Sequence, residues 1–207
     1  MRKALLFSGL VIMGGIIVSF AMLNSNKPEE VNPKEKISNQ YTESDLSQSE
    51  FKWYTVEEAI AQNKVSGKKI FIDVYTTWCG PCKWLDANTF SNPVIRKQLN
   101  DYFIPTKFNA ESSDTIYFKD KVFVNPKPNA APRMSTHEFT VYIASTQQGI
   151  AYPTMVFLDE NMDMIQPISG ALSAEQLEPV LEYIGKDYFK TTPWETFTQS
   201  YKSNLNH

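Results

Sequence analysis

Cysteine and histidine are scarce in this chain, with 2 of each among 207 residues. Numbers this small exclude a disulfide-dense scaffold and a zinc site made of four cysteines. A basic excess is also missing, because 20 Lys and Arg stand against 23 Asp and Glu. This charge balance gives no reason to expect nucleic acid as a partner. The chain has no glycine-rich phosphate loop, and we expect neither a metal ion nor a bound cofactor.

One long apolar run stands at the N-terminus. Arg2 and Lys3 precede Ala4–Leu23, which contains no charged residue. That length matches the hydrocarbon core of a bilayer, and the two cations favour the cytoplasmic side. We therefore expect residues 1–23 to be a membrane anchor, with a cleaved signal peptide as the alternative. In both cases the rest of the chain is exported and faces the periplasm or another extracytoplasmic space, tethered or soluble.

Residues 24–50 are polar, contain Pro28 and Pro33, and have few apolar side chains. Such a segment buries too little surface to offset its ordering entropy, which predicts a flexible linker. Residues 51–190 follow as the predicted folded domain, and 191–207 as a polar C-terminal tail in which Trp194 and Phe197 are able to pack back onto it.

The folded part alternates predicted strands and helices, which indicates an α/β layer architecture. Lys69–Tyr75 is almost continuous in apolar β-forming residues, as in a strand buried on both faces. Thr55 with Glu58, and Ser173 with Gln176, form capping boxes that begin two helices. Predicted strands are 51–54, 69–75, 102–108, 154–158 and 164–169; predicted helices are 55–64, 79–88, one from Pro93, 137–147 and 173–189.

Residues 111–134 lie between the third strand and the helix after it. Residues 116–118 and 122–124 are predicted to pair as a hairpin around Lys119 and Asp120, with proline-rich loops behind them. A connection of this length is more often functional than idle. It could cover the active site, recognise a partner or extend the sheet.

Both cysteines lie in one window, Trp78–Lys83, which reads WCGPCK and opens a predicted helix directly after a buried strand. Spacing of three residues places the two sulfurs on one helical face. Cys79 stands at the helix N-terminus, where free N–H groups and the helix dipole lower a thiol pKa. Cys82 lies one turn further in and is expected to be better shielded. The pattern predicts attack by Cys79 on a disulfide and resolution by Cys82.

Other interpretations of the cysteine pair are weaker. A structural disulfide closing so short a loop removes little entropy from the unfolded chain. A zinc site would need further ligands, and His137 and His207 do not have ligand spacing. Inert thiols would leave the strand-to-helix context unexplained.

The segment FIDVYTTWCGPCK resembles the thioredoxin family, with Asp73 six residues before Cys79 as in that family. The resemblance extends over about 51–190 with one insertion at about 111–134. It implies a thioredoxin fold, with a central mixed sheet flanked by helices, the insertion between the third strand and the following helix, and a C-terminal extension.

The resemblance also implies the site residues. Tyr152, Pro153 and Thr154 match the cis-proline loop, which offers its backbone to substrate. Asp73 matches the buried acid; burial would raise its pKa and let it exchange protons with Cys82. The alternative is a structural acid paired with Lys107. By role, the expected residues are Cys79, Cys82 and Asp73 for catalysis; Trp78, Gly80, Pro81 and Lys107 for shaping the site; and Tyr152, Pro153 and Thr154 for binding substrate.

For three of these residues a plainer role stays open. Trp78 is expected to shield the cysteines but would also suit core packing. Tyr152 would either shape the docking surface or only pack. Pro153 would be an ordinary trans proline if the resemblance misleads.

Residues 86–94 are similar to the exported domain of the membrane thiol:disulfide interchange reductase. The pair Gly80–Pro81 resembles reducing thioredoxins, which favours a reductase acting on protein disulfides with a membrane electron donor. A disulfide isomerase or oxidase is the nearest alternative. A non-enzymatic binding protein that reuses the fold is another, and a peroxide-reducing enzyme is disfavoured because no arginine stands beside Cys79.

Overall fold

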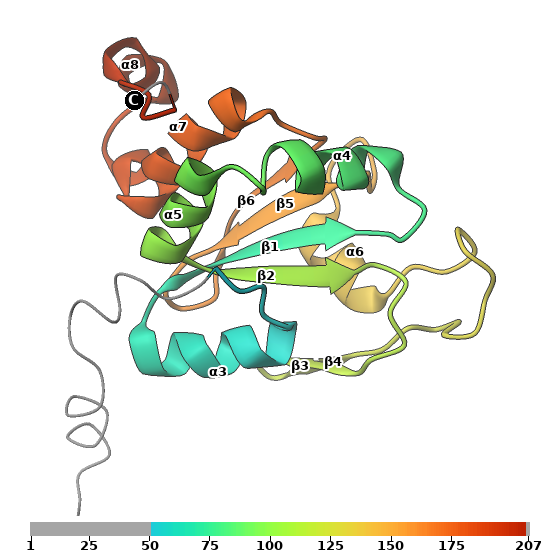
Figure 1. The fold of residues 1–207 in the computed structure, drawn as a ribbon. Helices are drawn as coiled ribbons and strands as arrows, with labels where there is room; N and C mark the ends of the chain where they lie inside the picture. The colour runs from blue at the N-terminus through green and yellow to red at the C-terminus, as the bar shows by residue number, and fades with distance from the viewer. Residues whose placement is uncertain (1–50, 206–207) are drawn as a thin grey trace, which may run out of the picture. The chain divides into compact units, whose positions relative to one another are not determined.

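The computed structural model describes residues 51–205, drawn in colour in Figure 1. The predicted anchor at 1–23 and linker at 24–50 lie outside the described residues. Within 51–205, no helix has both the length and the apolar character needed to span a bilayer.

A four-stranded mixed sheet forms the centre of the fold, in the order β2-β1-β5-β6. Strand β1 pairs parallel with β2 and antiparallel with β5, which pairs antiparallel with β6. The strands are β1 (Lys69–Tyr75), β2 (Phe103–Asn109), β5 (Thr154–Leu158) and β6 (Met164–Ser169). These bounds confirm the four predicted strands to within one residue.

Helices cover both faces of the sheet (Figure 1). Their bounds are α3 (Val56–Ser66), α4 (Gly80–Asn88), α5 (Pro93–Tyr102), α6 (Glu138–Ala144), α7 (Ala174–Gly185), the 3₁₀ helix η1 (Tyr188–Lys190) and α8 (Trp194–Ser200). Both predicted capping boxes are present, and Asn92 caps α5 ahead of Pro93. Local sequence therefore fixes where three of these helices begin.

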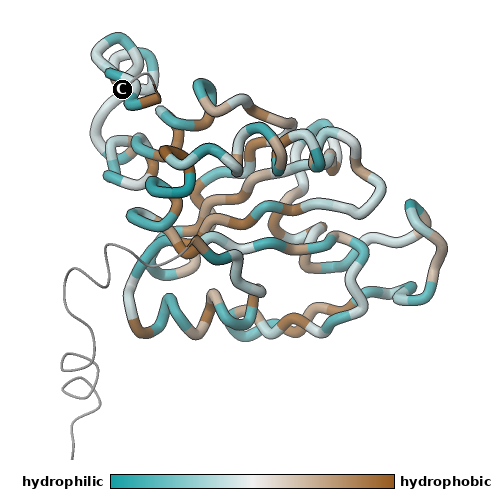
Figure 2. The backbone as a smooth tube through the Cα atoms, in the orientation of Figure 1, coloured by the Kyte–Doolittle hydropathy of each residue, from teal (hydrophilic) through white to brown (hydrophobic). Residues whose placement is uncertain are grey.

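Side chains of β1 alternate between two hydrophobic clusters, one on each face of the sheet. Ile70, Ile72 and Val74 pack with residues of α3 and α6. Phe71 packs on the other face with residues of α4, α5 and α7. Figure 2 shows hydrophobic residues along the central strands. Asp73 is two residues after Phe71, so it lies on the face that α4 covers.

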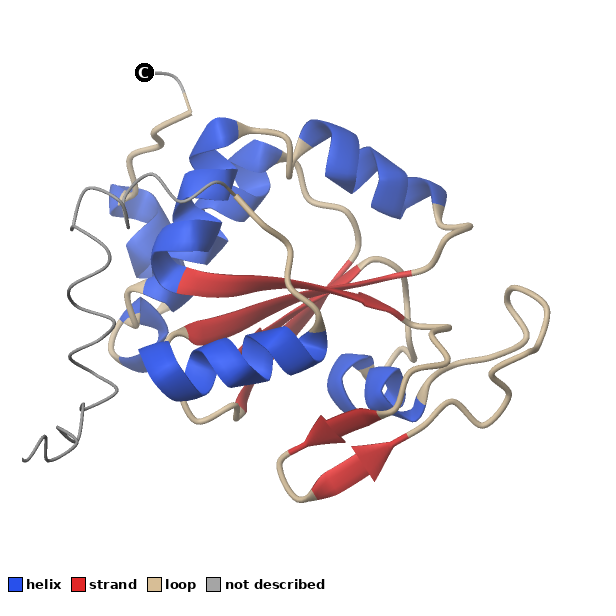
Figure 3. Cartoon of the chain, turned by 60° about the horizontal axis from the view of Figure 1, so that its bottom comes forward, coloured by secondary structure: helices blue, strands red, loops and turns tan. Residues whose placement is uncertain are grey.

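The insertion begins with the predicted hairpin, β3 (Ile116–Phe118) and β4 (Lys121–Phe123), which forms a separate two-stranded sheet (Figure 3). Phe118 and Phe123 are buried and contact the Phe139 ring of α6 at centroid distances of 5.3 and 5.5 Å. The hairpin thereby extends the core on the side of α3 and α6.

Three predicted elements differ from the structure. Residues 51–54 form no strand: only Tyr54 makes a bridge, to Thr106, while Phe51 and Trp53 pack on the core. The helix predicted over 137–147 ends at Ala144, because Thr146 and Gly149 close a turn by mutual backbone hydrogen bonds.

The helix predicted to reach Phe189 ends at Gly185. Asp187 takes a left-handed conformation with φ of 62°, and its carboxylate lies 3.0 Å from Lys69 Nζ. Beyond it, the tail forms α8, and both Trp194 and Phe197 contact the Tyr183 ring of α7 at 5.0 Å. The two aromatic residues pack back as the sequence indicated.

Candidate active site

Cys79 is the N-cap of α4. Its Sγ accepts a hydrogen bond of 3.1 Å from the backbone N–H of Cys82, inside the first turn of the helix. The two cysteines form a disulfide, with Cα atoms 5.3 Å apart. A helix N-terminus presents free N–H groups and a positive dipole end, which stabilise negative charge on sulfur.

Shielding of the two cysteines does not follow the prediction. Cys82 was expected to be better shielded, but each cysteine is 3% exposed. The disulfide holds both sulfurs together, so they share one buried environment. Gly80 and Pro81 are exposed between them, and a Cβ built on Gly80 would have no atom within 4 Å. The motif therefore offers open space on its outer side.

Asp73 and Lys107 lie opposite each other on parallel strands β1 and β2. Asp73 is 1% exposed, and its Oδ2 lies 3.2 Å from Lys107 Nζ. Lys107 Nζ also pairs with Asp86 of α4. Asp86 is a residue whose contact with Lys107 the sequence did not indicate.

Aromatic rings surround the ammonium of Lys107. Its Nζ lies 5.1 Å from the ring centroids of Trp53 and Tyr75 and 5.8 Å from that of Phe90. Ring faces attract a cation, and more strongly where water is excluded. These contacts hold Lys107 in place between the two carboxylates.

The pKa of Asp73 is raised from 3.8 to about 6, chiefly by burial. Lys107 opposes this change and Asp86 adds to it. Asp73 Oδ1 has no hydrogen-bond partner among residues 51–205. Asp73 is thus paired with Lys107 and its pKa is raised, while its proton exchange with Cys82 stays a prediction.

The Tyr152–Pro153 peptide bond is cis, as the family resemblance implied. Pro153 is buried, and its carbonyl accepts a 2.8 Å hydrogen bond from Gly170 N–H. Thr154, the first residue of β5, donates from its hydroxyl to the carbonyl of Ala151 at 2.8 Å. The loop that precedes β5 is therefore held at both ends.

Trp78 joins the cysteine loop to two other segments. Its ring meets that of Tyr152 edge-on, with centroids 5.9 Å apart. Its Nε1–H donates to Glu111 Oε2 at 2.9 Å, and the Arg133 guanidinium lies 4.7 Å from its ring centroid. Trp78 is partly exposed, so it is not enclosed in the core, and its shielding of the cysteines stays a prediction.

The sequence analysis did not identify Glu111 or Arg133 as site residues. Both belong to the insertion, where no periodic pattern places side chains, and Arg133 is far from Cys79 along the chain. The sequence analysis expected no arginine beside Cys79; the structure places Arg133 over the ring of Trp78, the residue before it.

Within residues 51–205 there is no cluster of three or more Cys, His, Asp or Glu side chains that could hold a metal ion. His137 is fully buried, and both of its ring nitrogens are engaged. Nδ1 accepts from Phe139 N–H at 3.0 Å, and Nε2 lies 2.8 Å from the carbonyl of Asp114. Its role is to cap α6 and fasten the insertion.

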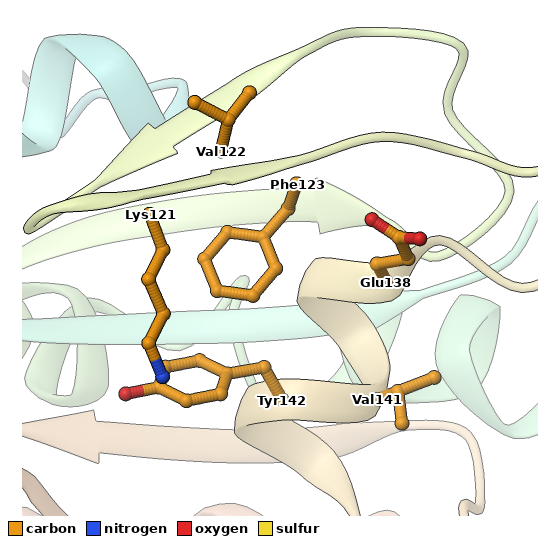
Figure 4. Close-up of a pocket in the computed structure, with 6 residues that line it drawn as sticks. All are labelled: Lys121, Val122, Phe123, Glu138, Val141 and Tyr142. Carbon is orange, nitrogen blue, oxygen red and sulfur yellow. The ribbon is translucent and has the colours of Figure 1, made fainter.

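A pocket of about 510 Å³ opens between β4 and α6 (Figure 4). Phe123 and Tyr142 give it an apolar wall, and Lys121 Nζ lies 4.7 Å from the Tyr142 ring centroid. Its lining residues are Lys121, Val122, Phe123, Glu138, Val141 and Tyr142, so it includes neither cysteine nor the cis-proline loop.

Comparison with known proteins identifies the family of this chain. The model of a family described as a thioredoxin-like domain matches residues 56–185. A curated relative, the thiol:disulfide interchange protein DsbD of Photorhabdus laumondii, is 39% identical over 49 residues, 24% of this chain. The matched stretch covers only 8% of that relative's length.

Solved structures of similar proteins include two from bacteria. A thioredoxin-fold protein from Helicobacter pylori is 21% identical with a TM-score of 0.49, over 77% of this chain and 89% of its own. A thioredoxin from Thermus thermophilus is 15% identical with a TM-score of 0.48, over 66% of this chain and 88% of its own.

Proposed function

The chain belongs to the thioredoxin-like family, and on that premise we propose that it is a thiol–disulfide oxidoreductase that reduces protein disulfides. The observation that carries the proposal is Cys79 at the N-cap of α4, with its Sγ accepting the N–H of Cys82. The same N–H would stabilise a thiolate on Cys79 in the reduced protein.

Reduction proceeds by two exchanges. The Cys79 thiolate attacks one sulfur of the substrate disulfide, forming a mixed disulfide and releasing the other sulfur as a thiolate. Cys82, as thiolate, then attacks Cys79 Sγ and releases the second substrate sulfur. Two electrons pass to the substrate, which takes up two protons, and the protein ends with the Cys79–Cys82 disulfide seen in the structure.

Asp73 is proposed as the group that takes the proton from Cys82. It lies on the sheet face covered by α4, the helix that contains Cys82, and its pKa of about 6 suits a base near neutral pH. Lys107 and Asp86 set the charge around it. Lys107 is therefore a positioning residue.

Substrate docking is assigned to the loop at Tyr152–Thr154. The contact of Tyr152 with Trp78 brings this loop beside the cysteine motif. Exposed Gly80 and Pro81 leave room for an extended peptide along the same surface. Such a peptide would be held by backbone contacts, so many protein sequences would be accepted.

The direction and place of the reaction are inferred from sequence. Gly80 and Pro81 between the cysteines favour a reductant, and residues 1–23 favour export with a membrane anchor. Exported compartments are generally oxidising. The protein would therefore depend on an electron donor in the membrane, in keeping with its similarity to an interchange protein.

Trapping tests the proposed function. In Cys82→Ser, the mixed disulfide at Cys79 cannot be resolved, so the full chain is expected to accumulate adducts with protein substrates that dissolve on adding dithiothreitol. Cys79→Ser is the matched control and should trap none. Equal trapping by both variants, or none by either, would contradict the exchange mechanism and favour a binding protein that reuses the fold.

A further inference from the structure

We propose that residues 125–136, here called the recognition arm, select protein disulfides flanked by acidic residues, with Arg133 as the specificity-determining residue. The proposal rests on the proposed function, since it names the substrate class of the same site. Figure 1 shows the arm, between β4 and α6, projecting on the side where β1 leads into α4.

The arm touches the cysteine motif directly. Glu111 fixes this contact with both carboxylate oxygens: Oε2 accepts from Trp78 Nε1–H, and Oε1 accepts from the backbone N–H of Arg133. The Arg133 guanidinium then covers the ring of Trp78, the residue before Cys79. Three residues after Arg133, the Thr136 side chain interacts with that of Tyr152, beside the cis-proline.

Both ends of the arm are anchored. Asn125 is 6% exposed; its Nδ2 donates to the carbonyl of Ser112 at 2.9 Å, and its Oδ1 accepts from the Ser135 hydroxyl at 2.6 Å. His137 N–H donates to the carbonyl of Ala110 at 2.8 Å. A loop tied in this way holds its side chains in place before a ligand arrives, which lowers the entropy lost on binding.

Charge on the arm is of one sign. The arm, residues 125–136, has two cations, Lys127 and Arg133, and no Asp or Glu, although the whole chain has a net charge of −3. Lys127 and Arg133 are exposed, and neither side chain forms an ion pair within residues 51–205. The local positive field is therefore not cancelled by the arm itself.

Arg133 is suited to bind a carboxylate where it lies, over the ring of Trp78. Its guanidinium forms no ion pair within residues 51–205, so its N–H donors are available to a substrate carboxylate, which a guanidinium binds in bidentate fashion. An Asp or Glu one or two positions from the substrate cysteine would meet Arg133 as that cysteine reaches Cys79. A basic residue there would be repelled, so the arm both favours acidic flanking residues and disfavours basic ones.

The test uses two disulfide-linked peptides that differ only in residues flanking the cysteines, Asp in one and Lys in the other. Full-length oxidised protein cannot exchange electrons with an oxidised peptide, so their binding is measured without reaction, by titration in low salt. We expect the Asp peptide to bind about fivefold more tightly, as one screened charge pair predicts. The preference should shrink in about 0.5 M salt, because the Debye length there is only a few ångströms.

Arg133→Ala should abolish most of this preference, and Arg133→Lys should keep part of it. Lys64→Ala, which removes one exposed cation from α3, is the matched control and should keep all of it. Equal binding of both peptides by the wild type, or an unchanged preference in Arg133→Ala, would overturn the proposal. Reduction of the peptides is scored separately: a charge preference in binding without turnover would count against the proposed function and for the arm.

Discussion

Asp73 and Lys107 face each other on adjacent parallel strands, with Lys107 Nζ 3.2 Å from Asp73 Oδ2. The pairing does not neutralise the effect of burial, because the pKa of Asp73 still rises to about 6. The Lys107 ammonium forms ion pairs with both Asp73 and Asp86. The negative charge of Asp86 opposes ionisation of Asp73. The result is a buried acid that titrates near neutral pH, beneath the helix that contains Cys82.

Stability should fall as Asp73 ionises. Its folded pKa of about 6 exceeds the ordinary 3.8, so the folded state binds the proton more tightly than the unfolded state. This group therefore destabilises the fold by about 2 kcal/mol as pH rises from 4 to 7. Asp73→Asn removes that loss: in urea unfolding of the oxidised protein, it should gain stability over wild type at pH 8 and none at pH 4. The same gain at both pH values would contradict the assignment.

The same substitution should slow resolution of the mixed disulfide. Without a base, Cys82 must lose its proton to water, so the rate of product release at pH 7 should fall about a hundredfold. The rate in the wild type should rise through pH 6, and that rise should vanish in Asp73→Asn. Rapid-mixing kinetics on a single peptide disulfide would measure both; Asp86→Asn, which leaves Asp73 in place, should shift the rise to lower pH without removing it.

Glu111 should control the order of the recognition arm. Glu111→Ala removes the acceptor for both Trp78 Nε1–H and Arg133 N–H. Trypsin should then cut after Arg133 about tenfold faster, since hydrogen bonds to a charged group are lost. Glu57→Ala, an exposed change on α3, serves as control. An unchanged cleavage rate in Glu111→Ala would show that the arm is held by other contacts.

His137 should stabilise the fold through its two hydrogen bonds. His137→Ala loses the cap of α6 and the contact with Asp114, which should lower the free energy of unfolding by about 2–4 kcal/mol. His137→Asn keeps an oxygen that can cap Phe139 N–H and should lose about 1 kcal/mol less. Chemical denaturation compares the three proteins. If Asn and Ala are equally destabilising, the cap contributes nothing.

Local patterns predicted much of the fold. The apolar run at Lys69–Tyr75, the capping boxes at Thr55 and Ser173, and the WCGPCK window each depend on residues within a few positions of one another. Helix ends were less predictable: α7 stops where Asp187 turns to reach Lys69, a contact that sequence spacing does not reveal. The end of α7 therefore depends on the tertiary contact between Asp187 and Lys69 rather than on local sequence.

Some residues of the candidate active site were likewise predictable from local sequence, and others were not. Cys79, Cys82, Asp73 and the cis-proline loop were placed by motif and family resemblance. Glu111 and Arg133 were not, because they come from an insertion without periodicity and reach Trp78 only after β3 and β4 have packed on Phe139. Asp86 was not predicted as a site residue, because its pairing with Lys107 depends on α4 and β2 coming together in the fold.

The reduction potential of the Cys79–Cys82 pair in the full-length protein tests the central claim most directly. A reductant is expected to equilibrate with glutathione or dithiothreitol at about −270 mV, the value of thioredoxin. A potential above about −180 mV would contradict the reductase assignment and make the protein an isomerase or oxidase. Failure to form the disulfide at all would contradict thiol–disulfide exchange itself.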